Sequence, residues 1–181
     1  MKVDRRTKET DVSVTLVLAP GQVAGDTVLR FLNHMVGTLG TCAGWSLDVR
    51  ARGDLPHHVI EDVGIALGTA VHGARAAAVA RYGHRVIAMD DALVAATVDV
   101  GGRPFYVGNV PSSLYDHFLR SFSEHARLTL HVEVRRGRDR HHVVEAAFKA
   151  VGFALRDALV PVEEVVSTKG AVVASVTGDS A

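Results

Sequence analysis

The chain has 181 residues with 20 basic and 20 acidic side chains, so its formal net charge of zero argues against nucleic acid or an anionic membrane surface as its partner. A hydrophobic content of 48% is ordinary for a globular protein, and no uncharged apolar stretch approaches the roughly 20 residues that a membrane-spanning helix needs. Cys42 is the only cysteine, which excludes an internal disulfide and, together with the charged N-terminal segment, leads us to expect a cytoplasmic protein.

The first half of the chain shows strand and helix patterns in alternation. Polar and apolar residues alternate over residues 11–18 and again over 46–52, which predicts two strands, and residues 29–41 between them have a helical pattern. A turn containing Gly53 then leads to residues 57–74, where apolar side chains spaced by four, three and four residues mark one face of a helix.

The second half repeats this order and adds a short hairpin return. Its strand patterns lie at residues 93–100, 105–107 and 128–135, and its helical patterns at 112–126 and 141–158. The last helices of the two halves align at a constant offset of 84 residues, with eight of 18 positions identical. The identical positions include His57/His141, His58/His142 and Glu61/Glu145.

Duplication explains this similarity better than a coincidence between two amphipathic helices. We therefore predict an α+β fold of two β-β-α-β-α half-domains, residues 1–86 and 87–181, which pack as one compact unit. Helices are expected to cover one face of the sheet in each half.

The two His-His-x-x-Glu segments are typical of metal ligands. Residues three or four apart lie on the same face of a helix, whereas adjacent histidines diverge by about 100°. Each pair therefore serves two ions better than one, so we predict two metals with ligands from both repeats or from neighbouring subunits. Imidazole and carboxylate suit manganese, iron, zinc or nickel. A solvated first helical turn is the alternative for one copy, but two equivalent copies favour metal binding.

Several segments together resemble the imidazoleglycerol-phosphate dehydratase family, from Arg5 to Lys169. They include RRTKET at 5–10, FLNHM at 31–35, HHVIEDVGIALG at 57–68, RYG at 81–83, MDDAL at 89–93, VDVGGRP at 98–104, LTLHV at 128–132, HHVVEAAFKA at 141–150 and STKG at 167–170. The resemblance implies a lyase of histidine biosynthesis that dehydrates D-erythro-imidazole-glycerol phosphate to imidazole-acetol phosphate. It also implies a 24-subunit homo-oligomer with two Mn²⁺ ions in each interfacial active site.

The resemblance also implies roles for individual residues. The expected metal ligands are His34, His57, His58, Glu61, His131, His141, His142 and Glu145. The expected substrate contacts are Glu9, Arg81, Arg103, Ser167 and Lys169, of which the cations and the hydroxyl suit a phosphate dianion. Two metals would hold the substrate ring as an imidazolate, which can expel hydroxide, and Glu9 and Glu61 are the expected catalytic proton carriers.

The sequence differs from the family pattern close to these ligands. Asn33 replaces an aspartate, Cys42 a histidine, Val59 a hydroxyl residue and Asp91 a glutamate, and the loop before His57 is about three residues shorter. Because residues behind the ligands tune metal affinity, a related metal lyase acting on another phosphorylated substrate is the first alternative. A metal-bound oligomeric assembly without turnover is the second.

Nucleic-acid binding is the third alternative, prompted by a basic cluster between the last predicted strand and helix. That cluster contains Arg135, Arg136, Arg138 and Arg140. Glu133 and Asp139 lie beside it and the net charge is zero, so a solvated loop is the better interpretation.

Overall fold

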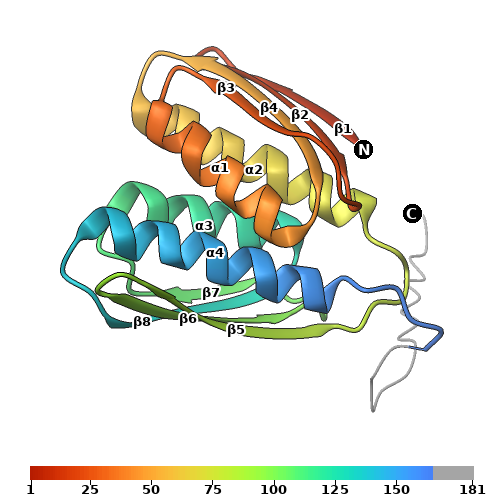
Figure 1. Cartoon of the computed structure of the whole chain (residues 1–181). Helices are drawn as coiled ribbons and strands as arrows, with labels where there is room; N and C mark the ends of the chain where they lie inside the picture. The colour runs from red at the N-terminus through yellow and green to blue at the C-terminus, as the bar shows by residue number, and fades with distance from the viewer. Residues whose placement is uncertain (165–181) are drawn as a thin grey trace, which may run out of the picture.

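The computed structural model describes residues 1–164 and consists of a sheet, two layers of helices and a second sheet (Figure 1). The first sheet has the strand order β1-β2-β4-β3. Strand β3 is parallel to β4, and the pairs β1–β2 and β2–β4 are antiparallel. Its strands are β1 (Lys2–Arg6), β2 (Thr10–Val17), β3 (Val23–Thr27) and β4 (Ser46–Gly53).

The second sheet has the equivalent order β5-β6-β8-β7, again with one parallel pair, β7 and β8. Its strands are β5 (Tyr82–Met89), β6 (Ala92–Asp99), β7 (Phe105–Gly108) and β8 (Thr129–Arg136). The helices are α1 (Arg30–Ala43), α2 (Pro56–Ala74), α3 (Ser113–Ala126) and α4 (Arg140–Ala158). Helices α1 and α2 cover the first sheet, and α3 and α4 cover the second (Figure 1).

The predicted α+β fold and its duplication are confirmed, because both halves have the same element order and sheet topology. The structure adds a strand to the start of each half, β1 and β5, and it also contains β3, for which no residue range was predicted. Strand β1 is a short edge strand in which charged residues alternate with half-buried ones, so its apolar signal is weak. Strand β5 pairs with β6 along its whole length, and the expected boundary between residues 86 and 87 therefore lies inside a strand of the second sheet.

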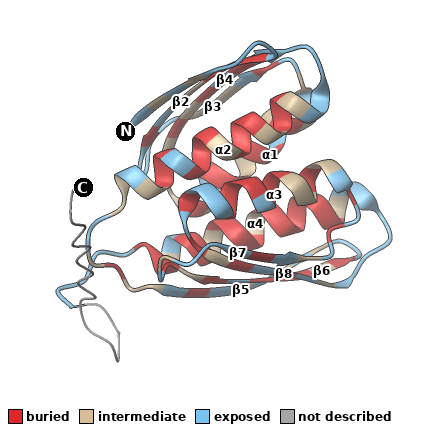
Figure 2. Cartoon of the chain, turned by 180° about the vertical axis from the view of Figure 1, so that it is seen from behind, coloured by how far each residue is buried: buried red, intermediate tan, exposed pale blue. Residues whose placement is uncertain are grey.

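Hydrophobic periodicity explains why the sheets and helices bury the faces that they do. In β2, Val12, Val14 and Leu16 are buried and alternate with more exposed residues, so one face of the strand packs on the helices. The buried residues of all four helices join those of both sheets in one core cluster, which lies between the sheets (Figure 2). Within residues 1–164, no helix has both the length and the apolarity to cross a membrane.

The helices of the two halves meet at small residues. A Cβ atom on Gly68 of α2 would lie 2.4 Å from the Phe122 carbonyl oxygen of α3, and one on Gly152 of α4 would lie 2.7 Å from the Cys42 Cβ of α1. These glycines are equivalent in the repeat, at the offset of 84 residues. The two halves therefore interlock as pairs α1–α4 and α2–α3, with each pair taking one helix from each half.

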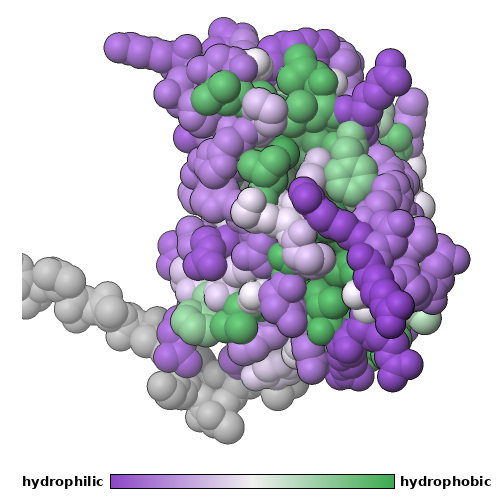
Figure 3. Space-filling model, turned by 90° about the vertical axis from the view of Figure 1, so that its left-hand side faces the viewer, coloured by the Kyte–Doolittle hydropathy of each residue, from purple (hydrophilic) through white to green (hydrophobic). Residues whose placement is uncertain are grey.

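The four helices begin at the same end of the molecule (Figure 1). Helix α4 starts with Asp139 as its N-cap, which accepts a 2.7 Å hydrogen bond from the His141 N–H, and α2 starts with Pro56 in its first turn. The hairpin turns β1–β2 and β5–β6 lie at this end as well. Every His-His-x-x-Glu segment is thereby brought to one end of the molecule, which has a mainly hydrophilic surface (Figure 3).

Candidate metal centres

The first candidate centre lies where α1 meets α4 and contains His34, His141 and Glu145. The Glu145 Oε2 atom is 2.9 Å from His34 Nε2 and 3.1 Å from His141 Nε2. Burial opposes ionisation of Glu145, but hydrogen bonds from Lys149 and His34 outweigh it and lower the pKa of the Glu145 carboxyl to about 2. Both imidazoles therefore face an anionic carboxylate near neutral pH.

The second candidate centre lies where α2 meets α3 and contains His57, Glu61 and His117. The Glu61 Oε2 atom is 3.5 Å from His57 Nε2, and its Oε1 atom is 3.3 Å from His117 Nε2. That second contact is too poorly directed for a hydrogen bond, and His117 Nε2 is buried without a hydrogen-bond partner among residues 1–164. A buried imidazole nitrogen that lies beside a carboxylate and makes no hydrogen bond suits a metal ligand.

The two centres have the same composition and equivalent positions in the repeat. In each, two histidine nitrogens and a carboxylate oxygen lie within 4.8 Å of one another, which would allow all three atoms to bind one ion. Each draws ligands from both halves of the chain. Two imidazoles and a carboxylate suit a divalent transition metal such as Mn²⁺, with coordination positions left for further ligands.

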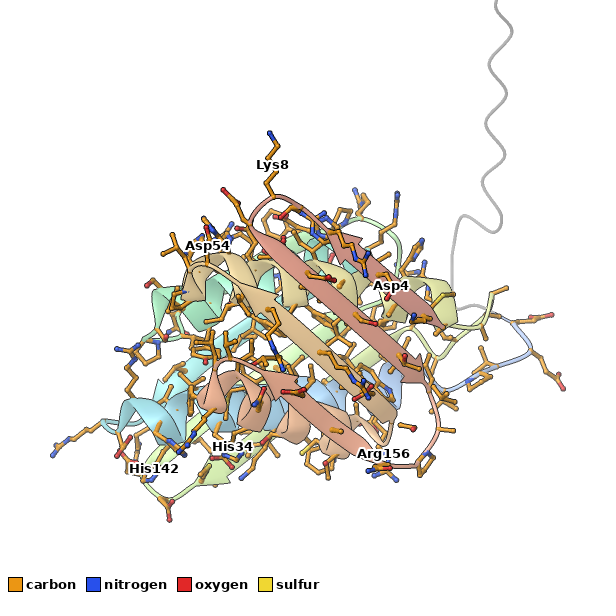
Figure 4. All side chains as sticks on the ribbon, turned by 90° about the horizontal axis from the view of Figure 1, so that it is seen from above. Asp4, Lys8, His34, Asp54, His142 and Arg156 are labelled. Atoms are coloured by element: carbon orange, nitrogen blue, oxygen red, sulfur yellow. The ribbon has the colours of Figure 1, made fainter. Side chains whose placement is uncertain are left out.

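His58 and His142 turn away from these clusters. The rings of His57 and His58 are nearly perpendicular, and so are those of His141 and His142. Hydrogen bonds of 2.8 Å join His58 Nδ1 to Asp54 and His142 Nδ1 to Asp91, which raises the pKa of both imidazoles. Each carboxylate fixes a ring orientation in which Nε2 is the other ring nitrogen, and in His142 that nitrogen lies 3.5 Å from the exposed Asp90 carboxylate. His34, Asp54 and His142 lie toward the same end of the molecule (Figure 4).

Glu9 lies beside the second centre, on the turn between β1 and β2. Its Oε2 atom is 3.6 Å from His58 Nδ1. The turn is held against α2 by Asp62, which accepts a 2.9 Å hydrogen bond from Arg5 Nε and a short one from the Thr10 hydroxyl. The RRTKET and HHVIED segments are therefore joined by a buried carboxylate, and this contact places Glu9.

The expected substrate-binding arginines lie in the second half, at the end of the molecule opposite to the candidate metal centres. The Arg81 N–H donates a hydrogen bond to the carbonyl oxygen of Ala158, at the end of α4, and the Arg103 carbonyl accepts one from Thr129 at the start of β8. Helix α4 has 19 residues and is about 28 Å long, and it begins near His141 and ends near Arg81. Within one chain, these arginines are therefore far from His141. Ser167 and Lys169, and the C-terminal tail for which fraying was expected, lie outside the described residues.

Comparison with known proteins decides the family. The sequence profile of the imidazoleglycerol-phosphate dehydratase family matches residues 27–155. The chain belongs to this family. An imidazoleglycerol-phosphate dehydratase from Pyrobaculum calidifontis is 48% identical over 188 residues, covering 94% of this chain and 98% of the relative. One from Anaeromyxobacter sp. (strain K) is 47% identical over 173 residues, covering 86% and 83%.

Solved structures of imidazoleglycerol-phosphate dehydratases (IGPD) have the same fold as this chain. The crystal structure of IGPD from Pyrococcus furiosus has a TM-score of 0.87 and 36% identity, covering 94% of this chain and all of that chain (100%). The imidazoleglycerol-phosphate dehydratase from Staphylococcus aureus has a TM-score of 0.77 and 33% identity, covering 90% and 99%. Membership of the family makes the chain a hydro-lyase.

The structure brings His117 into a centre and leaves His131 out of both. In β8, Leu130 and Val132 face the helices, so His131 lies on the exposed outer face of the sheet, next to the Phe105 ring. His117 has no adjacent histidine or glutamate motif to mark it. The repeat holds the missing signal, because α1 and α3 align at an offset of 83 residues, which pairs His117 with His34.

The structure also shows what two of the departures from the family pattern do. The Asn33 side chain accepts hydrogen bonds from the Thr27 N–H and hydroxyl and donates one back to the Thr27 carbonyl, a donation that aspartate could not make. Asp91 accepts backbone hydrogen bonds from Arg138 and Asp139 and still reaches His142. Those bonds, led by the Arg138 N–H, hold the pKa of Asp91 well below its usual range.

Cys42 and Val59 change the surroundings of the centres in other ways. Cys42, with Thr38 and Lys149, lines a cavity of about 410 Å³ beside His34. Burial raises the pKa of the Cys42 thiol, which disfavours the thiolate form that binds metals. Val59 is fully buried and packs in the core, where a hydroxyl would need a partner.

Proposed function

We propose that the chain dehydrates D-erythro-imidazole-glycerol phosphate to imidazole-acetol phosphate in histidine biosynthesis, and that it does so in the cytoplasm with two Mn²⁺ ions per active site. The observation that carries the metal requirement is the pair of equivalent His/His/Glu clusters, one of which has a buried imidazole nitrogen that makes no hydrogen bond within residues 1–164. Membership of the dehydratase family supports the substrate.

The reaction has to remove a weakly acidic C–H proton and expel hydroxide without a neighbouring carbonyl group. Bound metal ions would supply Lewis acidity that stabilises negative charge on the substrate ring. His34, His141 and Glu145 would hold one ion, and His57, Glu61 and His117 the other. His58 and His142, oriented by Asp54 and Asp91, would supply further ligands or contact the substrate.

Glu9 is the better of the two expected proton carriers. Both oxygens of Glu61 face imidazoles of the second centre, which favours Glu61 as a metal ligand over a proton carrier. Glu9 has a side chain that is 57% exposed, lies next to His58 and is held on a turn that Asp62 anchors. A Glu9→Gln variant is therefore expected to lose turnover and keep its metal. Normal turnover in this variant would remove Glu9 from the role.

The substrate phosphate would bind Arg81, Arg103, Ser167 and Lys169 of a second copy. For the arginines we infer this from helix α4, which lies between them and the His141 cluster of one chain and whose length of about 28 Å exceeds that of the substrate. The active site would then lie between subunits of a homo-oligomer, in keeping with the 24-subunit assembly that we expect for the family. The His141→Ala and Arg103→Ala variants can be unfolded, mixed and refolded together. The mixed assembly should regain activity that neither variant has alone.

The test of the function is turnover of imidazole-glycerol phosphate by the manganese-loaded protein, with His141→Ala as the control. Formation of imidazole-acetol phosphate that the control lacks supports the dehydratase. Metal-loaded and assembled protein without turnover would favour the alternatives instead. A changed phosphorylated substrate is the first of these, because Cys42 and Thr38 line the cavity beside His34. A metal-bound assembly without catalysis is the second.

A further inference from the structure

The two candidate centres differ in what their glutamates can offer to a cation. In the first centre, Lys149 Nζ lies 2.9 Å from Glu145 Oε1, and only Oε2 faces the two histidines. In the second centre, each oxygen of Glu61 faces a different imidazole, and no ammonium group in residues 1–164 forms an ion pair with it. Glu145 is thus limited to one oxygen, whereas Glu61 has two.

The repeat isolates the cause of this difference. Helices α2 and α4 align at an offset of 84 residues, and the position equivalent to Lys149 is Ile65. Both residues are half-buried and lie four positions after the glutamate, one helical turn further along the same face. Lys149 also donates to the Met89 sulfur, which helps to hold its ammonium in place. The two centres are therefore a natural comparison of the same ligand set with and without a fixed positive charge.

A fixed ammonium weakens a cation site in two ways. It withdraws electron density from the carboxylate that it contacts, and its charge repels a divalent ion a few ångströms away. Burial strengthens both effects, because the Glu145 side chain is 9% exposed and that of Glu61 is 35% exposed.

We infer that the two centres bind divalent cations with different affinities, and that Lys149 makes the Glu145 centre the weaker one. The Glu61 centre then fills first as the metal concentration rises. The inference rests on the proposed metal binding and goes beyond it, since two equivalent ions would satisfy the proposed function equally well.

Binding of Mn²⁺ to the full chain, followed by the electron paramagnetic resonance signal of the free ion, tests this directly. Two classes of site are expected, with His57→Ala removing the tighter class and His141→Ala the weaker one. Lys149→Met should tighten the weaker class by about tenfold, the lower end of what residues behind a metal ligand contribute. Ile65→Lys should weaken the tighter class, and Lys2→Met, which removes the same charge at an exposed ion pair far from both centres, should change neither.

Each contrary result has a distinct meaning. Equal affinities, loss of the tighter class in His141→Ala, or no tightening in Lys149→Met would overturn the inference and leave metal binding in place. Absence of Mn²⁺ binding to the assembled protein would overturn the proposed metal dependence itself. Circular dichroism and the size of the assembly show that each variant is folded.

Discussion

The imidazole rings of His57 and His117 stack with centroids 4.9 Å apart and planes inclined by 28°, although one residue belongs to each half of the chain. Glu61 lies against both rings. Ring stacking and a shared carboxylate hold the two nitrogens toward one point before any ion arrives, which lowers the entropic cost of metal binding. The corresponding rings of His34 and His141 are 5.8 Å apart and likewise share Glu145.

The first prediction separates His117 from His131. His117→Ala removes one of three ligands from the second centre, so we expect the metal content to fall from two ions to one per chain and turnover to be lost. His131→Ala changes an exposed residue on the outer face of β8 and should leave the metal content at two. Metal analysis of the purified variants measures both. Two ions bound to His117→Ala and one to His131→Ala would instead support His131 as the ligand, as expected from the sequence.

The second prediction concerns the carboxylate behind His142. Asp91→Ala removes the acceptor that fixes the His142 ring and the acceptor of two backbone N–H groups. We expect a loss of metal affinity or activity of about 10- to 100-fold. Asp90→Ala is the matched control, because Asp90 is exposed and lies 3.5 Å from the other ring nitrogen. Equal effects of the two substitutions in a Mn²⁺ titration would argue against a positioning role for Asp91.

The third prediction tests the anchor of the Glu9 turn. Asp62→Ala removes the hydrogen bonds that Arg5 and Thr10 make to a buried carboxylate, which should cost about 2 kcal/mol of stability. Turnover should also fall, because Glu9 loses its fixed position. Asp11→Ala breaks an exposed ion pair with Arg6 and should change stability by no more than about 0.5 kcal/mol. Thermal unfolding and steady-state kinetics measure the two effects; a stable Asp62→Ala with normal turnover contradicts both.

The fourth prediction concerns the close approach of the two halves. Gly68→Val places a side chain against the backbone of α3 and should destabilise the protein by at least ~2 kcal/mol, with loss of the second centre, whose ligands come from α2 and α3. Gly37→Ala is the control, because a Cβ there meets no atom within 4 Å. Alanine in a helix interior should stabilise the control by about 0.5–1 kcal/mol. A melting temperature that falls in both variants would show that the close approach is not the cause.

The sequence by itself determined the duplicated α+β fold. It also determined that the His-His-x-x-Glu ligands lie in the first turns of their helices. These are local properties, since hydrophobic spacing fixes the buried face of a helix and a spacing of four residues puts His57 with Glu61 and His141 with Glu145. The order of motifs was also sufficient to indicate the dehydratase family, which the comparisons then confirmed.

Only the tertiary structure decided which helices meet. The pairs α1–α4 and α2–α3 form across the two halves because Gly68 and Gly152 allow close approach there, and no local pattern encodes which partner each glycine faces. That pairing brings His117 to Glu61 and His34 to Glu145. The position of His131 also depends on tertiary structure. Strand alternation places His131 on the opposite face of the sheet from Leu130 and Val132, but only the packing of the helices shows that this face points away from the centres.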